Sequence, residues 1–141
     1  MNPNLYNSEG YFDPTPYEAI KRIEGVSKQP RQYMPLVYIC SPFSGNVAEN
    51  IRAARRYSRF ALEKGCIPIA PHLLFPQFMN DSDPEERDLA IGMDLILLSK
   101  CSELWMFGST VSSGMGIELA YAKRKSKLIR NFDTDCKEVH K

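Results

Sequence analysis

Two acidic residues, Asp94 and Glu118, occupy positions where a carboxyl group could take part in chemistry. Asp94 interrupts the apolar run 89–98, and an acid within an apolar helix is unfavourable unless it is paired or faces a cavity. Glu118 follows a glycine-containing turn that leads from a predicted strand into a helix. Two carboxyl groups over one pocket can act as nucleophile and proton donor, as in glycosyl transfer. The plainer alternatives are a surface acid at 94 and a carboxylate at 118 in the first helical turn, where it favours the positive helix end.

Two loops rich in small residues accompany these acids. The first spans residues 41–46 and the second residues 108–116, each between a predicted strand and a helix. The first loop can cradle a phosphate or another anion at a helix N-terminus, although it could also be a plain turn. The glycines of the second loop let a ligand approach the backbone closely. The first loop has neither G-x-G-x-x-G nor the lysine of a P-loop, so it does not call for a dinucleotide or ATP. The candidate binding residues in the two loops are Ser41, Phe43, Ser44, Gly45, Ser112, Gly114 and Gly116.

Apolar runs and capping residues predict alternating strands and helices from residue 36 onward. This alternation implies right-handed crossovers and a parallel sheet, in which ligands bind beyond the carboxyl ends of the strands. Pro68 suggests that the second strand lies at an edge of the sheet. We expect strands at 36–40, 66–70, 103–107 and 127–130, and helices at 46–64, 83–99 and 114–125.

The first 35 residues differ from the rest of the chain. They hold five of the 10 prolines, together with several Asn and Tyr residues. Thr15 followed by Pro16 predicts the start of a short helix that runs to about Glu24, and residues 27–35 have the composition of a linker. We therefore expect an N-terminal extension at 1–35 and one α/β domain at 36–141.

Composition excludes several classes of protein. The 141 residues contain 18 Lys and Arg against 17 Asp and Glu, so the net charge of +1 gives no electrostatic reason to bind nucleic acid. No apolar run reaches the roughly 18 residues of a membrane helix, and the N-terminus lacks a signal-peptide pattern. The four cysteines form no C-x-x-C pair, and Cys40 and Cys66 lie in strand-like runs, which predicts reduced core residues of a cytoplasmic protein. We expect no metal and no cofactor, because no His/Cys cluster has metal-ligand spacing.

Several of these residues occur in an order that resembles one enzyme superfamily. The run V-Y-I-C at 37–40 with its small-residue loop, then Asp94, then S-x-G-x-G-x-E-L at 112–119, is similar to the nucleoside 2-deoxyribosyltransferases, a superfamily that includes 2′-deoxynucleoside 5′-phosphate N-hydrolases. The resemblance covers residues 36–130. It implies a flavodoxin-like, Rossmann-like, doubly wound parallel sheet of four to five strands with helices on both faces. It also implies a homo-oligomeric enzyme that cleaves or transfers at the N-glycosidic bond of a deoxynucleoside or its 5′-monophosphate.

The resemblance assigns roles to individual residues. Glu118 matches the glutamate that attacks the anomeric carbon, and Asp94 matches the aspartate that handles the proton on the departing base. Tyr38 matches a tyrosine near the nucleophile, and His72 resembles a pocket histidine after the second strand. Ser112 stands six residues before Glu118, where the transferases carry an aspartate and the phosphate-recognising hydrolases a serine. A hydroxyl at that position favours a phosphorylated substrate, because a carboxylate would repel it.

Other features leave alternatives open. The first loop lacks the arginine that those hydrolases tend to use for phosphate, and Arg52 or Arg87 could replace it. The loop residues Phe75, Phe78 and Met79 could form a lid or a base-stacking wall, or could contact another subunit.

Two other functions compete with an enzyme. One is a non-catalytic nucleotide-binding or sensor module on the same fold. The other is an interaction domain that uses a basic helical stripe, for which a solvated helix face is the simpler interpretation. The members of that stripe are Arg52, Arg55, Arg56 and Arg59.

Overall fold

The computed structural model describes residues 33–140 of the chain. The helix and linker predicted before residue 33 lie outside this part, and the division into an extension and a domain stays a prediction. The strands are β1 (Leu36–Cys40), β2 (Ile67–Ile69), β3 (Glu103–Phe107), β4 (Leu128–Phe132) and β5 (Glu138–Val139). The helices are α2 (Val47–Glu63), α3 (Pro84–Ser99) and α4 (Ser113–Arg124), with the short 3-10 turns η1 (Pro71–Leu73) and η2 (Phe75–Gln77) between β2 and α3.

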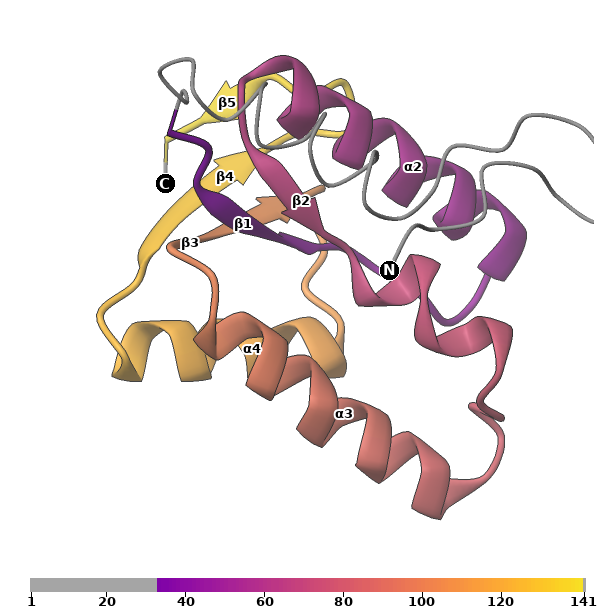
Figure 1. Ribbon diagram of the computed structural model, residues 1–141. Helices are drawn as coiled ribbons and strands as arrows, with labels where there is room; N and C mark the ends of the chain where they lie inside the picture. The colour runs from indigo at the N-terminus through magenta and orange to yellow at the C-terminus, as the bar shows by residue number, and fades with distance from the viewer. Residues whose placement is uncertain (1–32, 141) are drawn as a thin grey trace, which may run out of the picture. The chain divides into compact units, whose positions relative to one another are not determined.

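The five strands form one sheet in the order β2-β1-β3-β4-β5. The first four strands are parallel, and β5 pairs antiparallel with β4. Helix α2 covers one face of the sheet, while α3 and α4 cover the other (Figure 1). This is the flavodoxin-like doubly wound arrangement that we expected, with β2 at an edge as Pro68 suggested. The short antiparallel β5 was not foreseen.

The helices begin and end at the residues that local chemistry favours. The Asn46 side chain accepts a hydrogen bond from the Glu49 backbone N–H at 3.3 Å and caps α2. Gly65 has a φ of +81°, so this glycine ends the helical region in the left-handed conformation. The Asp83 side chain accepts from the Glu85 N–H at 3.0 Å, and Pro84 takes the first position of α3.

Each face of the sheet has its own apolar core. On the α2 side, the Phe107 ring stacks between Tyr57 and Phe132, with ring centroids 4.1 and 5.0 Å apart. The other core joins Tyr38 and Leu98 to residues of α4. The prediction that Cys40 and Cys66 are core residues is confirmed, since both are buried, as are Trp105 and Phe107 on β3.

Within residues 33–140, the helices are too short or too polar to cross a membrane.

Candidate active site

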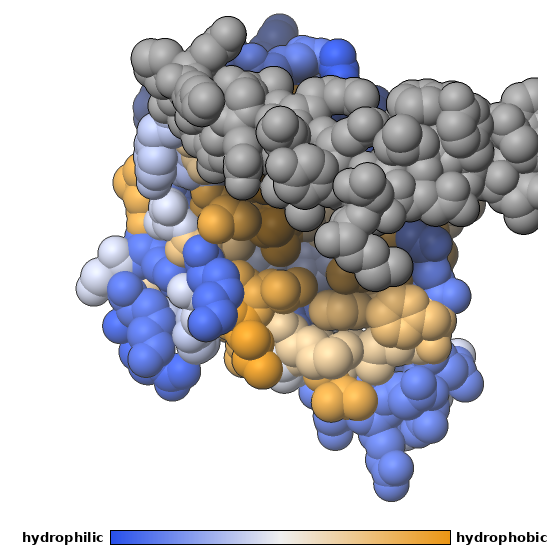
Figure 2. Space-filling view, in the orientation of Figure 1, coloured by the Kyte–Doolittle hydropathy of each residue, from blue (hydrophilic) through white to orange (hydrophobic). Residues whose placement is uncertain are grey.

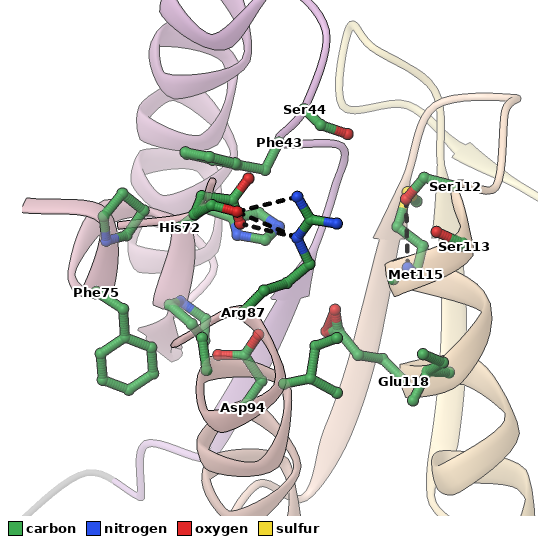
Figure 3. A pocket seen from close by; sticks show the side chains of 17 residues that line it. Phe43, Ser44, His72, Phe75, Arg87, Asp94, Ser112, Ser113, Met115 and Glu118 are labelled. Carbon is green, nitrogen blue, oxygen red and sulfur yellow. Dashed lines mark hydrogen bonds and ion pairs between the residues drawn. The ribbon is translucent and has the colours of Figure 1, made fainter. Parts of the chain in front are cut away.

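A cavity of about 270 Å³ opens beyond the carboxyl ends of the parallel strands (Figure 3). It lies at the end of β1, which has β2 on one side and β3 on the other. The connections of a doubly wound sheet leave in opposite directions at this point, and ligands usually bind there. Its walls come from the segments that follow β1, β2 and β3 and from helices α3 and α4. The lining residues are Phe43, Ser44, Pro71, His72, Phe75, Pro76, Asp81, Arg87, Ala90, Ile91, Asp94, Ser112, Ser113, Gly114, Met115, Ile117 and Glu118.

The structure brings most of the sequence-predicted site residues to this one cavity. Those that line it are Phe43, Ser44, His72, Asp94, Ser112, Gly114 and Glu118. The four that are not among its lining residues are Tyr38, Ser41, Gly45 and Gly116. Gly116 instead lies beside Val111, whose Cγ1 is 4.0 Å from the place of an added Cβ.

Glu118 lies in the second turn of α4. The prediction that it lies in the first turn is wrong, because Ser112 caps the helix and the helix begins at Ser113. The field of a helix end falls off within one turn, so it does not explain a carboxylate here. The Glu118 side chain is buried, and its Oε2 atom has no hydrogen-bond partner among the described residues. The pKa of Glu118 is raised to about 8, mainly by burial. The nearby Tyr38 hydroxyl opposes this rise, and the Asp94 carboxylate adds to it.

Asp94 reaches the same cavity from the opposite wall, on helix α3 (Figure 3). It is buried, and its Oδ1 atom has no hydrogen-bond partner within residues 33–140. Burial raises the pKa of Asp94 to about 7. A buried carboxyl group without a partner destabilises the fold, so two of them at one cavity are typical of a functional site.

Tyr38 is fully buried on β1 and lies close enough to Glu118 and Asp94 for both carboxylates to act on its hydroxyl. Its pKa is raised far above the usual value, first by burial and then by the Glu118 and Asp94 carboxylates. The phenol therefore keeps its proton and can donate a hydrogen bond. Its oxygen, like those of the two acids, has no partner in the described structure.

His72 and Phe43 form part of the wall. Since a carbonyl oxygen only accepts, the His72 Nε2 carries the hydrogen and donates it to the Ser41 carbonyl at 2.9 Å. Burial lowers the pKa of His72 although the Ser41 carbonyl raises it, so the ring is neutral near pH 7 and its Nδ1 is an acceptor. The Phe43 ring lies 5.1 Å from the His72 ring.

Polar groups line the remaining wall. The Ser112 Oγ accepts a hydrogen bond from the Met115 N–H at 3.3 Å, and Ser113 begins the helix beside it. Facing these serines, the Arg87 guanidinium donates from Nε and Nη2 to the Asp81 carbonyl at 3.1 and 3.0 Å. The Arg87 Nε also lies 4.0 Å from the carboxylate of Asp81, which lines the cavity as well. Arg52, the other arginine considered, pairs with Glu49 at 2.9 Å and does not line the cavity.

Several lining residues were missed by the sequence analysis. Ala90 and Ile91 lie on α3 with Arg87 and Asp94, at the spacings of three, four and seven residues that share one helix face. That periodicity, counted back from Asp94, would have identified them. Ile117 was missed as well, because nothing in its type marks a ligand contact.

Among the residues that the structure describes, His, Cys, Asp and Glu side chains form no group of three that could hold a metal ion.

Comparisons with known proteins place the fold. No curated protein matches the chain in sequence. The chain is similar in structure to a 2-deoxyribosyltransferase from the psychrotolerant bacterium Bacillus psychrosaccharolyticus, with a TM-score of 0.58 and 17% identity over 70% of this chain and 72% of that one. At this identity the likeness shows a shared fold. A family model described as a domain of unknown function (DUF7768) matches residues 35–132, and the chain belongs to that family.

Proposed function

We propose that this protein cleaves the N-glycosidic bond of a deoxynucleoside 5′-monophosphate, with Glu118 as nucleophile and Asp94 as proton donor. One observation carries the proposal: two buried carboxyl groups, each with an unpartnered oxygen, face one cavity from two different helices. Glycosidic bond cleavage uses this pair of groups. The similarity of the fold to a 2-deoxyribosyltransferase supports the same chemistry.

The reaction proceeds in two displacements. A carboxylate oxygen of Glu118 attacks the anomeric carbon as the bond to the base breaks, and the bonding electrons pass to the base nitrogen. Asp94 gives its proton to the departing base. Water then attacks the anomeric carbon, returns a proton to Asp94 and displaces the Glu118 carboxylate. The products are the free base and deoxyribose 5-phosphate, with retention at the anomeric carbon.

The protonation states of the two acids set the pH dependence. Cleavage needs Glu118 ionised and Asp94 protonated, while their pKa values are about 8 and about 7. Treated as independent groups, that form makes up on the order of 5% of the free enzyme near pH 7.5 and less on either side. The rate therefore has its maximum between the two pKa values. The Tyr38 hydroxyl favours the ionised Glu118 and so increases the active fraction.

A phosphate group fits the polar wall of the cavity. Arg87 is the one Arg or Lys among the lining residues, and it faces Ser112 and Ser113 at the N-terminus of α4 (Figure 3). A helix N-terminus and a guanidinium both favour an anion. Glu118 and Asp94 are buried whereas Arg87 is exposed, so a 5′-phosphate held by Arg87 would leave the sugar to extend toward the two acids.

The experiment is a base-release assay on a panel of deoxynucleosides and their 5′-monophosphates, analysed by chromatography. We expect release from the monophosphates by the wild type and none by Glu118→Gln, which keeps the shape of the side chain and removes its charge. The matched control, Glu63→Gln, alters an exposed residue of α2 and should keep full activity. A sugar phosphate added to Glu118, found by mass spectrometry after rapid quenching, would support the covalent step. Binding of monophosphates without turnover by the wild type would overturn the proposal in favour of a sensor module.

A further inference from the structure

A second cavity lies between helix α2 and the segment 71–77 that follows β2, and the proposed reaction leaves it unused. This segment packs beside the N-terminal half of α2 (Figure 1), and Figure 2 shows apolar residues at the surface where it runs. The cavity measures about 420 Å³ and shares two lining residues, His72 and Pro76, with the candidate active site. The two cavities therefore meet at this segment. The residues that line the second cavity are Ile51, Arg55, His72, Leu73, Pro76 and Gln77.

Arg55 is the one charged side chain among the residues that line this second cavity. It belongs to the basic stripe of α2, in which the other arginines are paired with glutamates of the same helix. Glu49 lies 2.9 Å from Arg52 and 3.9 Å from Arg56, and Arg59 has a second glutamate at 3.1 Å. Arg55 has no ion-pair partner within residues 33–140. Since the four arginines and two glutamates leave α2 with a net charge of +2, the ligand that this wall favours is an anion.

The size and the other walls of the second cavity indicate an organic ligand and not a bare ion. Small-molecule sites have volumes of roughly 300–1,000 Å³, and this cavity falls within that range. Beside Arg55 the walls are apolar, formed by Ile51, Leu73 and Pro76. The Gln77 Nε2 donates to the Leu73 carbonyl at 2.6 Å, so the Gln77 Oε1 is left to accept a hydrogen bond. A matching ligand has an anionic group, a flat apolar body and an N–H group on that body.

We propose that the second cavity binds a nucleotide, with its phosphate on Arg55 and its base against the apolar wall. A guanidinium can hold two phosphate oxygens through parallel N–H groups. The Gln77 Oε1 accepts a hydrogen bond from an N–H group of the base. Glu118 and Asp94 do not line this cavity, so the nucleotide is bound there and not cleaved. The proposal does not rest on the proposed function, because Arg55 does not line the candidate active site.

The test is isothermal titration calorimetry of the full chain with adenosine 5′-monophosphate, which has a phosphate, a flat base and an amino group on the base. We expect Arg55→Gln to weaken binding at the second cavity roughly 10- to 100-fold, from the loss of a charge-assisted hydrogen bond. The matched control, Arg59→Gln, removes the same charge from the same stripe but lies outside the cavity, so it should bind like the wild type. Circular dichroism checks that each variant is folded.

Two further titrations separate the second cavity from the candidate active site and identify the class of ligand. Arg87→Ala alters only the candidate active site, so binding that it keeps and Arg55→Gln loses belongs to the second cavity. Inorganic phosphate should bind more weakly than the nucleotide, because it lacks a body to contact the apolar wall. Absence of binding, equal losses with Arg55→Gln and Arg59→Gln, loss with Arg87→Ala alone, or phosphate binding as tight as that of the nucleotide would each overturn the proposal. The proposed function is judged separately, by base release.

Discussion

Replacing Glu118 by glutamine should stabilise the protein at alkaline pH while it removes the proposed nucleophile. The folded protein raises the pKa of Glu118 from 4.5 to about 8, mainly through burial. Between these values the folded state holds a proton that the unfolded chain releases. Unfolding therefore becomes more favourable as the pH rises, and the wild type loses stability from about pH 4.5 until Glu118 is ionised in both states.

The size of this loss follows from the shift. Each tenfold change in an acid dissociation constant corresponds to about 1.4 kcal/mol, so a rise in pKa from 4.5 to about 8 amounts to roughly 5 kcal/mol. This is a large part of the stability of a typical domain, about 5–15 kcal/mol. Glutamine has a similar shape and no ionisation in this range. The glutamine side chain therefore keeps the packing, and the variant lacks the pH-dependent loss.

Chemical unfolding in urea at a series of pH values measures the effect. The difference in unfolding free energy between Glu118→Gln and wild type should be small near about pH 4 and approach several kcal/mol near about pH 9. Glu63→Gln, on the exposed surface of α2, should follow the wild-type curve. If the curves of Glu118→Gln and wild type run parallel across this range, Glu118 is not a buried acid with a raised pKa, and the site as described is wrong.

Three further substitutions test the proposed roles. Asp94→Asn should lower the first-turnover release of an ordinary base by roughly 10²–10⁴-fold, yet leave nearly intact the first-turnover release of 7-methylguanine, which departs neutral without a proton; equal losses on both substrates in this first turnover, compared by rapid quenching and chromatography, would exclude Asp94 as proton donor. Arg87→Ala should raise KM for a 5′-monophosphate roughly 10- to 100-fold, from the loss of a charge-assisted hydrogen bond, and leave KM for the nucleoside unchanged; a parallel rise for both would assign Arg87 to the fold instead of the phosphate. Tyr38→Phe removes the hydroxyl that lowers the pKa of Glu118, so the limb of the pH–kcat/KM profile that reports this acid should move to higher pH; an unmoved limb would show that the hydroxyl does not act on Glu118.

Much of the fold was predictable because its elements are specified locally. The apolar runs at 36–40 and 104–107 lie in strands that have the predicted bounds, 36–40 and 103–107, since a strand buried on both faces needs no alternation. Strand β5 was not predictable, because it has two residues and depends on pairing with β4. The turn before it is held by the Asp133 side chain, which accepts from the N–H groups of Asp135 and Lys137, and nothing in those residue types distinguishes this turn from a disordered tail.

The candidate site divides in the same way. Asp94 was recognisable in the sequence because an acid in an apolar helix is unfavourable, and Glu118 because it follows a turn of small residues. Asp94 and Glu118 are 24 residues apart in the chain (118 − 94). They share a cavity only because α3 and α4 pack against the same face of the sheet. Packing also decides which arginine lines the cavity. Both Arg52 and Arg87 lie in predicted helices, but only Arg87 lines the cavity, while Arg52 pairs with Glu49. Local patterns thus determine which side chains are available for chemistry, whereas their pKa values, partners and common cavity arise from burial, which exists only when distant segments pack together.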